Sequence, residues 1–268
     1  MHVDGRRLRI CILLWLVSAV AAAACSRPAT SPPSPPPATW TPAPQGSALY
    51  PGQVIDLANW YLTLPTGEER NPDNVYQPQL NTFADPWFHL NDSRDGVVFT
   101  GNAGGVTTKG STYPRSELRE MNGSNKASWS NTTGVHTMRL RQSVTQLPAV
   151  KPHVVTAQIH DATDDVIEVR LEGQHLLVEY DNGADEITLD PAYVLGAAYD
   201  LEITASDGHI RVSYDGTQKA DITISGSGWY NNLSRRTSRC GGTSAARACW
   251  VTKAPVGWGA GAADGQPR

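Results

Sequence analysis

Cysteine is absent from the long central part of this 268-residue chain. None occurs between Ser26 and Arg239, so the body of the chain is not a disulfide scaffold. A surplus of positive charge is also missing, because the formal net charge is −4. The chain therefore has no general basic field, and nucleic acid is not an expected partner. Any contact with a polyanion must use a local cluster of Arg, Lys and His.

A hydrophobic run long enough to cross a membrane is missing near the start of the chain. The apolar run Ile10 to Val20 is too short to span a bilayer. Three arginines precede it and the small residues Ala21 to Ala24 follow it, which is the order of a secretory signal peptide. We therefore expect residues 1–25 to be the signal peptide of an exported bacterial protein. An uncleaved N-terminal membrane anchor is the alternative.

Cys25 directly follows the alanine run, as the acceptor cysteine does in a bacterial lipoprotein signal, although Ala22 replaces the usual Leu. Residues 26–47 are rich in Pro, Ser, Thr and Ala, a composition typical of a stiff, extended linker. We expect Cys25 to carry the lipid of a cell-surface lipoprotein, with the linker lifting a domain off the membrane. Ordinary cleavage near the same point would instead release a secreted protein.

Helical periodicity is missing from the body, and short alternating runs take its place from Val97 onward. In Ile167 to Glu172, for example, apolar and charged residues alternate. Asp181-Asn182-Gly183, Asp207-Gly208 and Asp215-Gly216 stand between such runs and indicate type I′ hairpin turns. This pattern predicts an all-β sandwich or barrel of antiparallel sheets.

The run from Arg115 to Arg119 has an unusual distribution of charge. As a strand it places Arg115, Glu117 and Arg119 on one face. The pattern alone favours a solvated charged face. The alternative is functional: Glu117 pairs with both arginines, whose spare donors then suit a carboxylate.

A second run, Val154 to His160, carries polar residues at the end of an apolar strand. Gln158 and His160 share one face, and Ile159 points the other way. A histidine alone is more often a satisfied core residue than a functional one. A buried amide beside a buried imidazole, however, needs partners or a ligand.

Together the two strands suggest one kind of chemistry. Arg and Gln donors neutralise a carboxylate and stabilise the enolate-like charge that develops when the proton α to it is removed. A His or Tyr serves as base, and a Tyr or His as acid toward the leaving glycosidic oxygen. The predicted reaction is β-elimination of a polyuronate, which requires no metal and no cofactor.

Three segments resemble the signatures of alginate lyases of polysaccharide lyase family 7. Arg115-Ser116-Glu117-Leu118-Arg119 resembles the family's Arg-Ser/Thr-Glu-Leu-Arg signature, and Gln158-Ile159-His160 resembles its Gln-Ile-His signature. Asn59 to Pro65 is similar to its usual first strand. Because several motifs occur in order over about residues 54–230, the resemblance is specific.

The resemblance implies a concanavalin-like β-jelly roll of two curved antiparallel sheets, with alginate bound in a groove on the concave face. It assigns carboxylate neutralisation to Arg115 and Gln158. His160 then acts as base or neutraliser, and Glu117 and Arg119 bind and position the substrate. The expected protein is a monomeric polysaccharide lyase with no metal and no cofactor.

The end of the chain departs from the family pattern. The family's third signature, Tyr-Phe-Lys-Ala-Gly-x-Tyr-x-Gln, is expected at Tyr230, but Asn231 to Arg236 follow instead. We expect residues 48–230 to form the jelly roll and residues 231–268 to be an irregular, aberrant tail that resembles a gene read in a shifted frame. A genuine divergent extension and a basic interaction tail are the alternatives. Without the second Tyr the chain should cleave poorly, unless His160 or Tyr193 supplies the proton.

Two rival functions follow from these observations. The first is a catalytically impaired polyuronate-binding homologue, and the second is a lyase for another polyuronate such as glucuronan. The acidic residues Asp161, Asp164 and Asp165 raise the possibility of a metal site. We interpret them instead as a turn with a solvated face.

Overall fold

The computed structural model describes residues 47–237 and 245–252. The predicted signal peptide, Cys25 and nearly all of the linker lie outside these residues. Within them the fold is almost entirely β-structure, with two short 3-10 helices, η1 (Pro51–Gln53) and η2 (Gln79–Thr82). Among the described helices, none is long and apolar enough to cross a membrane.

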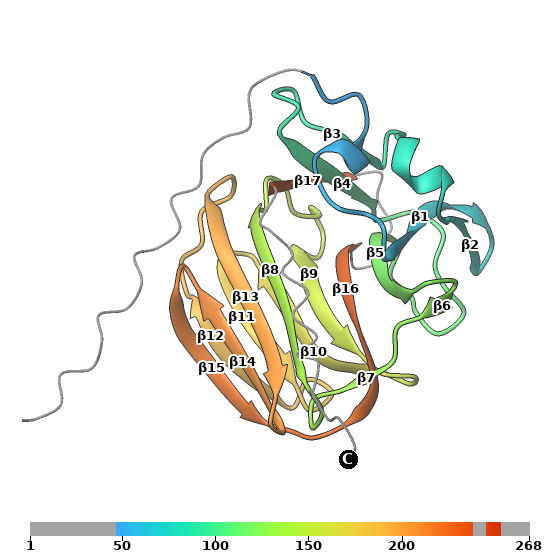
Figure 1. Cartoon of the computed structure of the whole chain (residues 1–268). Helices are drawn as coiled ribbons and strands as arrows, with labels where there is room; N and C mark the ends of the chain where they lie inside the picture. Colours follow the sequence, from blue (N-terminus) through green and yellow to red (C-terminus); the bar gives the residue numbers. More distant parts are fainter. Residues whose placement is uncertain (1–46, 238–244, 253–268) are drawn as a thin grey trace, which may run out of the picture. The chain divides into compact units, whose positions relative to one another are not determined.

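The strands form two antiparallel sheets, which Figure 1 shows one behind the other. The first sheet has the order β12 (Asp185–Asp190), β11 (His175–Tyr180), β10 (Asp165–Glu172), β9 (His153–His160), β16 (Ser227–Thr237), β5 (Arg115–Asn122), β1 (Trp60–Glu68) and β2 (Asn71–Val75). Two short strands extend it, β6 (Asn125–Lys126) beside β5 and β7 (Trp129–Ser130) beside β16. The second sheet has the order β15 (Thr217–Thr223), β14 (His209–Tyr214), β13 (Ala198–Ser206), β8 (Val135–Ser143), β17 (Ala245–Thr252), β4 (Gly96–Asn102) and β3 (Phe88–Leu90). The predicted all-β sandwich is therefore confirmed.

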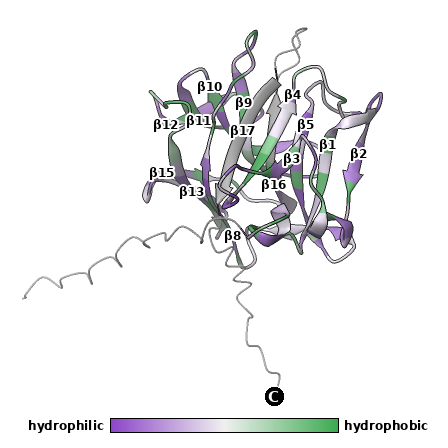
Figure 2. Ribbon diagram, turned by 90° about the horizontal axis from the view of Figure 1, so that it is seen from above, coloured by the Kyte–Doolittle hydropathy of each residue, from purple (hydrophilic) through white to green (hydrophobic). Residues whose placement is uncertain are grey.

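The core lies between the sheets because each strand turns its apolar residues inward. In β10, Ile167, Val169 and Leu171 are fully buried in the core, whereas Glu168 and Arg170 point away from it. Figure 2 shows that hydrophobic and hydrophilic residues are interspersed along many strands. The period-two pattern in the sequence thus identified the buried face correctly.

The predicted hairpin turns adopt the backbone conformation that their residues favour. Asp181 and Asn182, between β11 and β12, have φ angles of 52° and 53°. Asp207-Gly208 and Asp215-Gly216 likewise have positive φ at both residues. Asn, Asp and Gly tolerate this region, so the chain reverses tightly and adjacent strands pair.

The prediction of an irregular segment after Tyr230 is wrong for the described residues. Strand β16 continues to Thr237 and pairs with both β9 and β5, and β17 pairs with β4 and β8. Among the described residues, β16 thus fills the place between β9 and β5 in the first sheet. Alternation was hard to recognise because Asn231 and Asn232 are both buried polar residues in a central strand.

Leu233 provides a test of this correction, because its side chain packs in the core within β16. We expect Leu233→Ala to lower the free energy of unfolding by about 2–5 kcal/mol, as core truncations do. Leu195→Ala is the control, since Leu195 is exposed and its loss should change stability by about 0.5 kcal/mol or less. Urea denaturation of both variants measures the difference. Equal stabilities would show that the segment after Tyr230 does not belong to the fold.

Candidate active site

The polar residues of the first sheet lie on the face that points away from the core, called here the polar face. Pairing across the strands places five side chains in one row: Tyr61, Arg119, Asn232, Gln158 and Glu168. Residues directly opposite each other in antiparallel strands share a face. The two signature motifs, more than 30 residues apart in the chain, therefore share one surface, as the sequence predicted.

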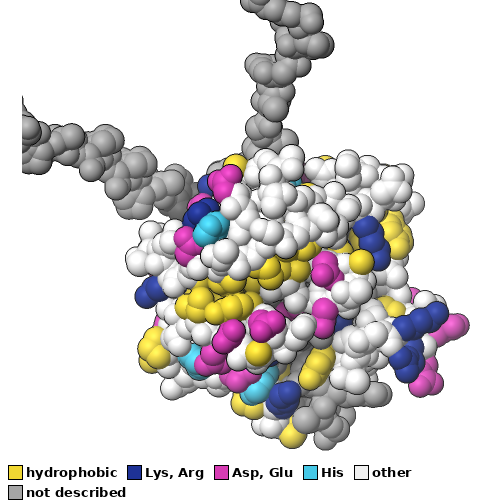
Figure 3. Space-filling model, turned by 90° about the horizontal axis from the view of Figure 1, so that it is seen from below, with side chains coloured by type: hydrophobic (Ala, Val, Ile, Leu, Met, Phe, Trp, Pro, Cys, Tyr) yellow, Lys and Arg dark blue, Asp and Glu magenta, His cyan; other side chains and the backbone are white. Residues whose placement is uncertain are grey.

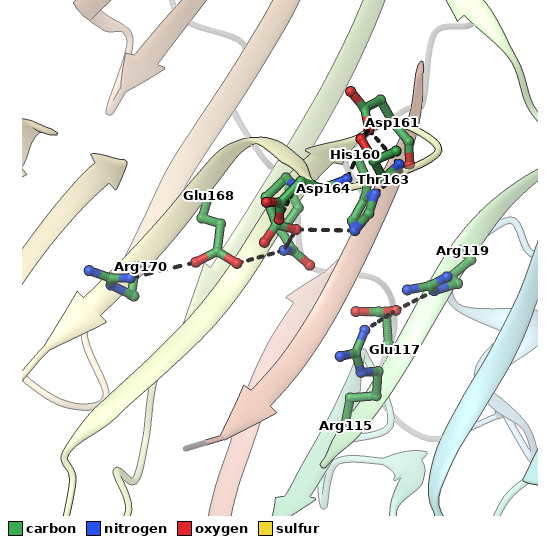
Figure 4. Close-up of polar contacts among 11 residues, drawn as sticks. Arg115, Glu117, Arg119, His160, Asp161, Thr163, Asp164, Glu168 and Arg170 are labelled. Carbon is green, nitrogen blue, oxygen red and sulfur yellow. Dashed lines mark hydrogen bonds and ion pairs between the residues drawn. The ribbon is translucent and has the colours of Figure 1, made fainter. Parts of the chain in front are cut away.

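Glu117 organises the two arginines of β5. Its Oε1 accepts hydrogen bonds from Arg115 Nη1 at 3.4 Å and from Arg119 Nε at 2.5 Å. Glu117 is completely buried and Arg115 is only 3% exposed. The solvated charged face that the pattern alone favoured is therefore wrong, and the predicted pairing of the Glu117 carboxylate with both guanidiniums is confirmed (Figure 4).

Arg119 remains charged in this setting. Burial is the largest single influence and by itself lowers the pKa of the Arg119 guanidinium. The charge and hydrogen bond of Glu117, together with Tyr61 and Tyr230, outweigh burial and raise the pKa above its ordinary value. Its guanidinium carbon lies 5.9 Å from the centre of the Tyr230 ring. The row therefore has a permanent positive charge beside a phenol.

Gln158 is completely buried, and its amide donors are already engaged. Its Nε2 donates to Asp165 Oδ1 and to Glu168 Oε1, the latter at 2.8 Å. Its Oε1 has no partner among the described residues. The amide thus currently presents an acceptor, and donation to a substrate carboxylate requires one of its two bonds to break.

Asn232 occupies the centre of the row, between Arg119 and Gln158. It is completely buried, and within the described residues neither atom of its amide has a hydrogen-bond partner. Buried polar groups are rarely left unsatisfied, and exceptions mark functional or strained positions. Sequence analysis did not select Asn232, because it placed this residue in the aberrant tail.

His160 lies at the end of β9 with its two ring nitrogens in different surroundings. Nδ1 is 2.6 Å from the carbonyl oxygen of Asp161, which can only accept, so Nδ1 carries a hydrogen. Nε2 is 3.4 Å from Asp165 Oδ1 and, in the neutral ring, has the free lone pair. Figure 4 shows this imidazole on the same face as the Arg115–Glu117–Arg119 cluster. His160 is thus equipped to accept a proton.

Tyr230 stacks on His160 across the β9–β16 pair. Their ring centres are 5.4 Å apart and the rings are inclined by 17°. Burial raises the pKa of the Tyr230 phenol, and Arg119 opposes this shift without cancelling it. The hydroxyl therefore holds its proton at neutral pH and can donate it to a neighbouring group.

Tyr61 is a second phenol in the row and was not selected from the sequence. It lies opposite Arg119, and its ring stacks on Tyr76 with the centres 5.0 Å apart. Burial also raises the pKa of Tyr61, again with Arg119 in opposition. The segment Asn59 to Pro65, which contains Tyr61, was recognised from the sequence, but its pattern did not indicate which face each aromatic residue would occupy.

Two other sequence hypotheses are settled by position. Tyr193 is a core residue, 1% exposed, whose hydroxyl donates to Ala197 O and accepts from Val144 N. It is therefore excluded as an alternative acid.

Asp161 is confirmed as a turn residue, because its carboxylate accepts hydrogen bonds from Thr163 and from the backbone of Asp164. Residues 47–237 and 245–252 contain no cluster that could hold a metal ion.

On the face of the molecule drawn in Figure 3, positive charge is scattered. In the view of Figure 3, the Lys and Arg side chains of the described residues stand apart near the margins, whereas acidic and hydrophobic groups occupy the middle. A pocket next to the row adds cationic groups to the same sheet. It is lined by Tyr113, Lys151, His153, Val154, Val155, Glu168 and Arg170. Arg170 in this pocket is paired with Glu168 and Glu172, so its charge is partly neutralised.

On the opposite face of β5, Glu120 connects three strands. Its Oε2 accepts hydrogen bonds from Trp129 Nε1 at 3.1 Å and from the backbone and side-chain nitrogens of Asn231 at 2.7 and 2.9 Å. Burial nevertheless raises the pKa of the Glu120 carboxyl above its ordinary value, and these bonds oppose the shift only in part. Glu120 thus anchors β16 next to Tyr230. Because its pKa is raised by burial, ionisation of this carboxyl lowers the stability of the fold.

Replacing Glu120 with Gln should expose this cost. Because its pKa is raised in the folded state, Glu120 contributes stability below the unfolded value of about 4.3, and this is lost as pH rises through the folded pKa. Gln keeps an acceptor oxygen but cannot ionise. Thermal melting at several pH values should therefore show Glu120→Gln gaining stability relative to the parent as pH rises. A difference that is constant with pH would contradict this account.

Comparison with known proteins gives a consistent result. A model of the alginate lyase family matches residues 55–238, which is more than half of the chain. Alginate lyase AlgAT5 of polysaccharide lyase family 7 is 44% identical, with a TM-score of 0.73 over 76% of this chain and 96% of its own. An alginate lyase from Corynebacterium sp. is 41% identical, with a TM-score of 0.72 and the same coverage of both chains.

More distant structures share the fold alone. Alginate lyase PA1167 from Pseudomonas aeruginosa is 21% identical, with a TM-score of 0.66 over 74% of this chain and 97% of its own. Among curated protein sequences, none matches. The family match continues eight residues beyond Tyr230, so the resemblance extends further toward the C-terminus than the sequence motifs indicated.

Proposed function

This chain belongs to the alginate lyase family, and we propose that it cleaves alginate by β-elimination on the polar face of the first sheet. One observation carries the proposal. Tyr230, which holds a proton, stacks on His160, whose Nε2 can accept one, beside the Arg115–Glu117–Arg119 cluster. Acid, base and carboxylate-binding groups therefore share one surface.

The arginines provide the electrostatic part of the reaction. When Arg115 and Arg119 bind the carboxylate of a uronate, their positive charges offset its negative charge. The adjacent C–H therefore becomes more acidic. Glu117 holds the two guanidiniums in place, which reduces the reorganisation needed when charge develops. Gln158 also binds the carboxylate if one of its amide N–H groups leaves its hydrogen bond to Asp165 or Glu168 and donates to the substrate instead.

Proton transfer then involves His160 and Tyr230. Nε2 of His160 removes the proton α to the carboxylate, and the electron pair forms the new C=C bond as the glycosidic C–O bond breaks. Tyr230 gives its proton to the departing oxygen. The products are an unsaturated uronate at one new end and a free hydroxyl at the other.

The proposal is tested by incubating the protein with alginate and following the ultraviolet absorbance of the unsaturated product. Appearance of this product, and its loss in His160→Asn, is the expected result. Binding of alginate without product would favour the impaired polyuronate-binding homologue instead. Faster release from glucuronan than from alginate would identify a lyase for that polymer.

We further propose that the C-terminal region departs from the family through a shifted reading frame. No Tyr follows Tyr230 in the sequence, so the family's Tyr-x-Gln ending is absent even though the family match reaches residue 238. Re-sequencing the gene after codon 230 decides the matter. An unchanged sequence would favour a genuine divergent extension.

We also propose that Cys25 carries a lipid and that the enzyme is displayed on the bacterial cell surface. The alanine run, the cysteine and the Pro-rich linker support this arrangement. Mass spectrometry of the mature N-terminus should find a lipidated Cys25, and Cys25→Ser should release the protein into the medium. An unmodified N-terminus at another residue would show a secreted enzyme.

A further inference from the structure

We propose that Asp165 is a positioning residue that stabilises His160 in its protonated state and holds Gln158 beside it. This inference rests on the proposed function, because it assigns Asp165 a part in the same proton transfer. Sequence alternation did not select Asp165 for the site, since the residue was interpreted only as part of an acidic turn.

A β-bulge brings Asp165 to the polar face. Strict alternation in β10 would place Asp165 on the same side as Ile167, in the core. The pairing with β9 shifts between Asp165 and Ile167, so that Asp165 lies opposite His160 while Val166 and Ile167 both pack in the core. Bulges of this kind re-aim a side chain and are frequent beside active sites.

The re-aimed carboxylate contacts both partners through one oxygen. Asp165 Oδ1 accepts a hydrogen bond from Gln158 Nε2 and lies 3.4 Å from His160 Nε2. The side chains of His160 and Asp165 are 18% and 17% exposed, so solvent screens their interaction only partly. Among the described residues, other charged or titratable groups around the imidazole include Tyr230 on β16, Arg119 beyond it on β5, and Asp161 and Asp164 in the adjacent turn.

This geometry lets Asp165 act after His160 has accepted the substrate proton. While His160 is neutral, Nε2 is free to take the substrate proton, because Nδ1 is held by the carbonyl of Asp161. Once Nε2 is protonated, the nearest carboxylate oxygen is that of Asp165, and a charge-assisted hydrogen bond forms. The same oxygen keeps Gln158 oriented, so the base and the neutralising amide are coupled.

The test compares Asp165→Asn with Asp164→Asn. Asn at 165 keeps an acceptor for Gln158 but removes the charge. Asp164 is an exposed neighbour whose side chain accepts a hydrogen bond from the backbone N–H of Asp165. We expect Asp165→Asn to lower kcat about 10- to 100-fold with a smaller change in KM, since a bond to a charged group is lost. The acidic limb of its pH–rate profile should move to lower pH. Asp164→Asn should match the parent, and Asp165→Glu should restore part of kcat.

A second measurement separates this inference from the proposed function. NMR titration of the His160 imidazole without substrate should show Asp165→Asn releasing its proton at lower pH than the parent. An unchanged titration, or a kcat and pH profile equal to the parent's, would overturn the role of Asp165. A changed titration in a protein that releases no unsaturated product would leave the pairing intact and refute the lyase function instead.

Discussion

Replacing Tyr230 with Phe is expected to lower kcat on alginate about 10²- to 10⁴-fold, the usual contribution of a general acid. The substitution removes only the hydroxyl, so the stack on His160 and the position under Arg119 persist. KM should change little, because the arginine cluster that binds the carboxylate is untouched. Steady-state kinetics from the ultraviolet absorbance of the product measures both quantities.

Tyr214→Phe is the matched control for this experiment. Tyr214 lies on β14 of the other sheet, where its hydroxyl donates to Asp190 Oδ2 at 2.9 Å. Its loss should cost about 1 kcal/mol of stability and leave kcat unchanged. If Tyr230→Phe retains the parent's kcat, the proton donor is another group on the polar face, and Tyr61 becomes the next candidate.

Replacing Glu117 with Ala is expected to give the largest loss of stability. The side chains of Glu117 and Arg115 are 0% and 4% exposed, and Arg119 shares the same carboxylate. Removing it leaves the buried Arg115 guanidinium and the largely buried Arg119 guanidinium without that counter-charge, a change that costs about 3–5 kcal/mol. Thermal melting should show a fall of about 2–4 °C for each kcal/mol lost. Glu117→Gln, which keeps an acceptor oxygen, should have an intermediate effect.

Glu202→Ala provides the comparison, because Glu202 also pairs with an arginine across two strands. Its partner is Arg139, at 2.9 Å, but these side chains are 42% and 43% exposed. Water screens such a pair, so its loss should cost about 0–1 kcal/mol. Equal losses in the two alanine variants would mean that burial does not decide the strength of the Glu117 pairs.

Much of the fold is contained in local sequence patterns. The alternation in Ile167 to Glu172 identified the core face of β10, and the turn residues near Asn182 and Gly208 identified the hairpins. The faces of Arg115 and Gln158 followed from the same rule. These properties depend on residues two positions apart or on the φ angle of single residues, so the chain determines them without distant contacts.

The relative placement of these pieces depends on long-range contacts. Strand β16, near the end of the chain, lies between β9 and β5, and this alone brings Tyr230 to His160 and Asn232 between Arg119 and Gln158. Alternation does not encode which strands become neighbours. For the same reason the end of the chain was misjudged, since a central strand with buried polar residues on its faces has no simple amphipathic pattern.

By itself, then, the sequence determined the strands, their turns and the motif residues that share a face, because these follow from local period and backbone conformation. Only the tertiary structure decided that Glu117 and Arg115 are buried rather than solvated, since burial depends on what other strands place around them. It also decided that Asp165 faces His160, because a bulge shifts the register by one residue and moves a side chain to the other face.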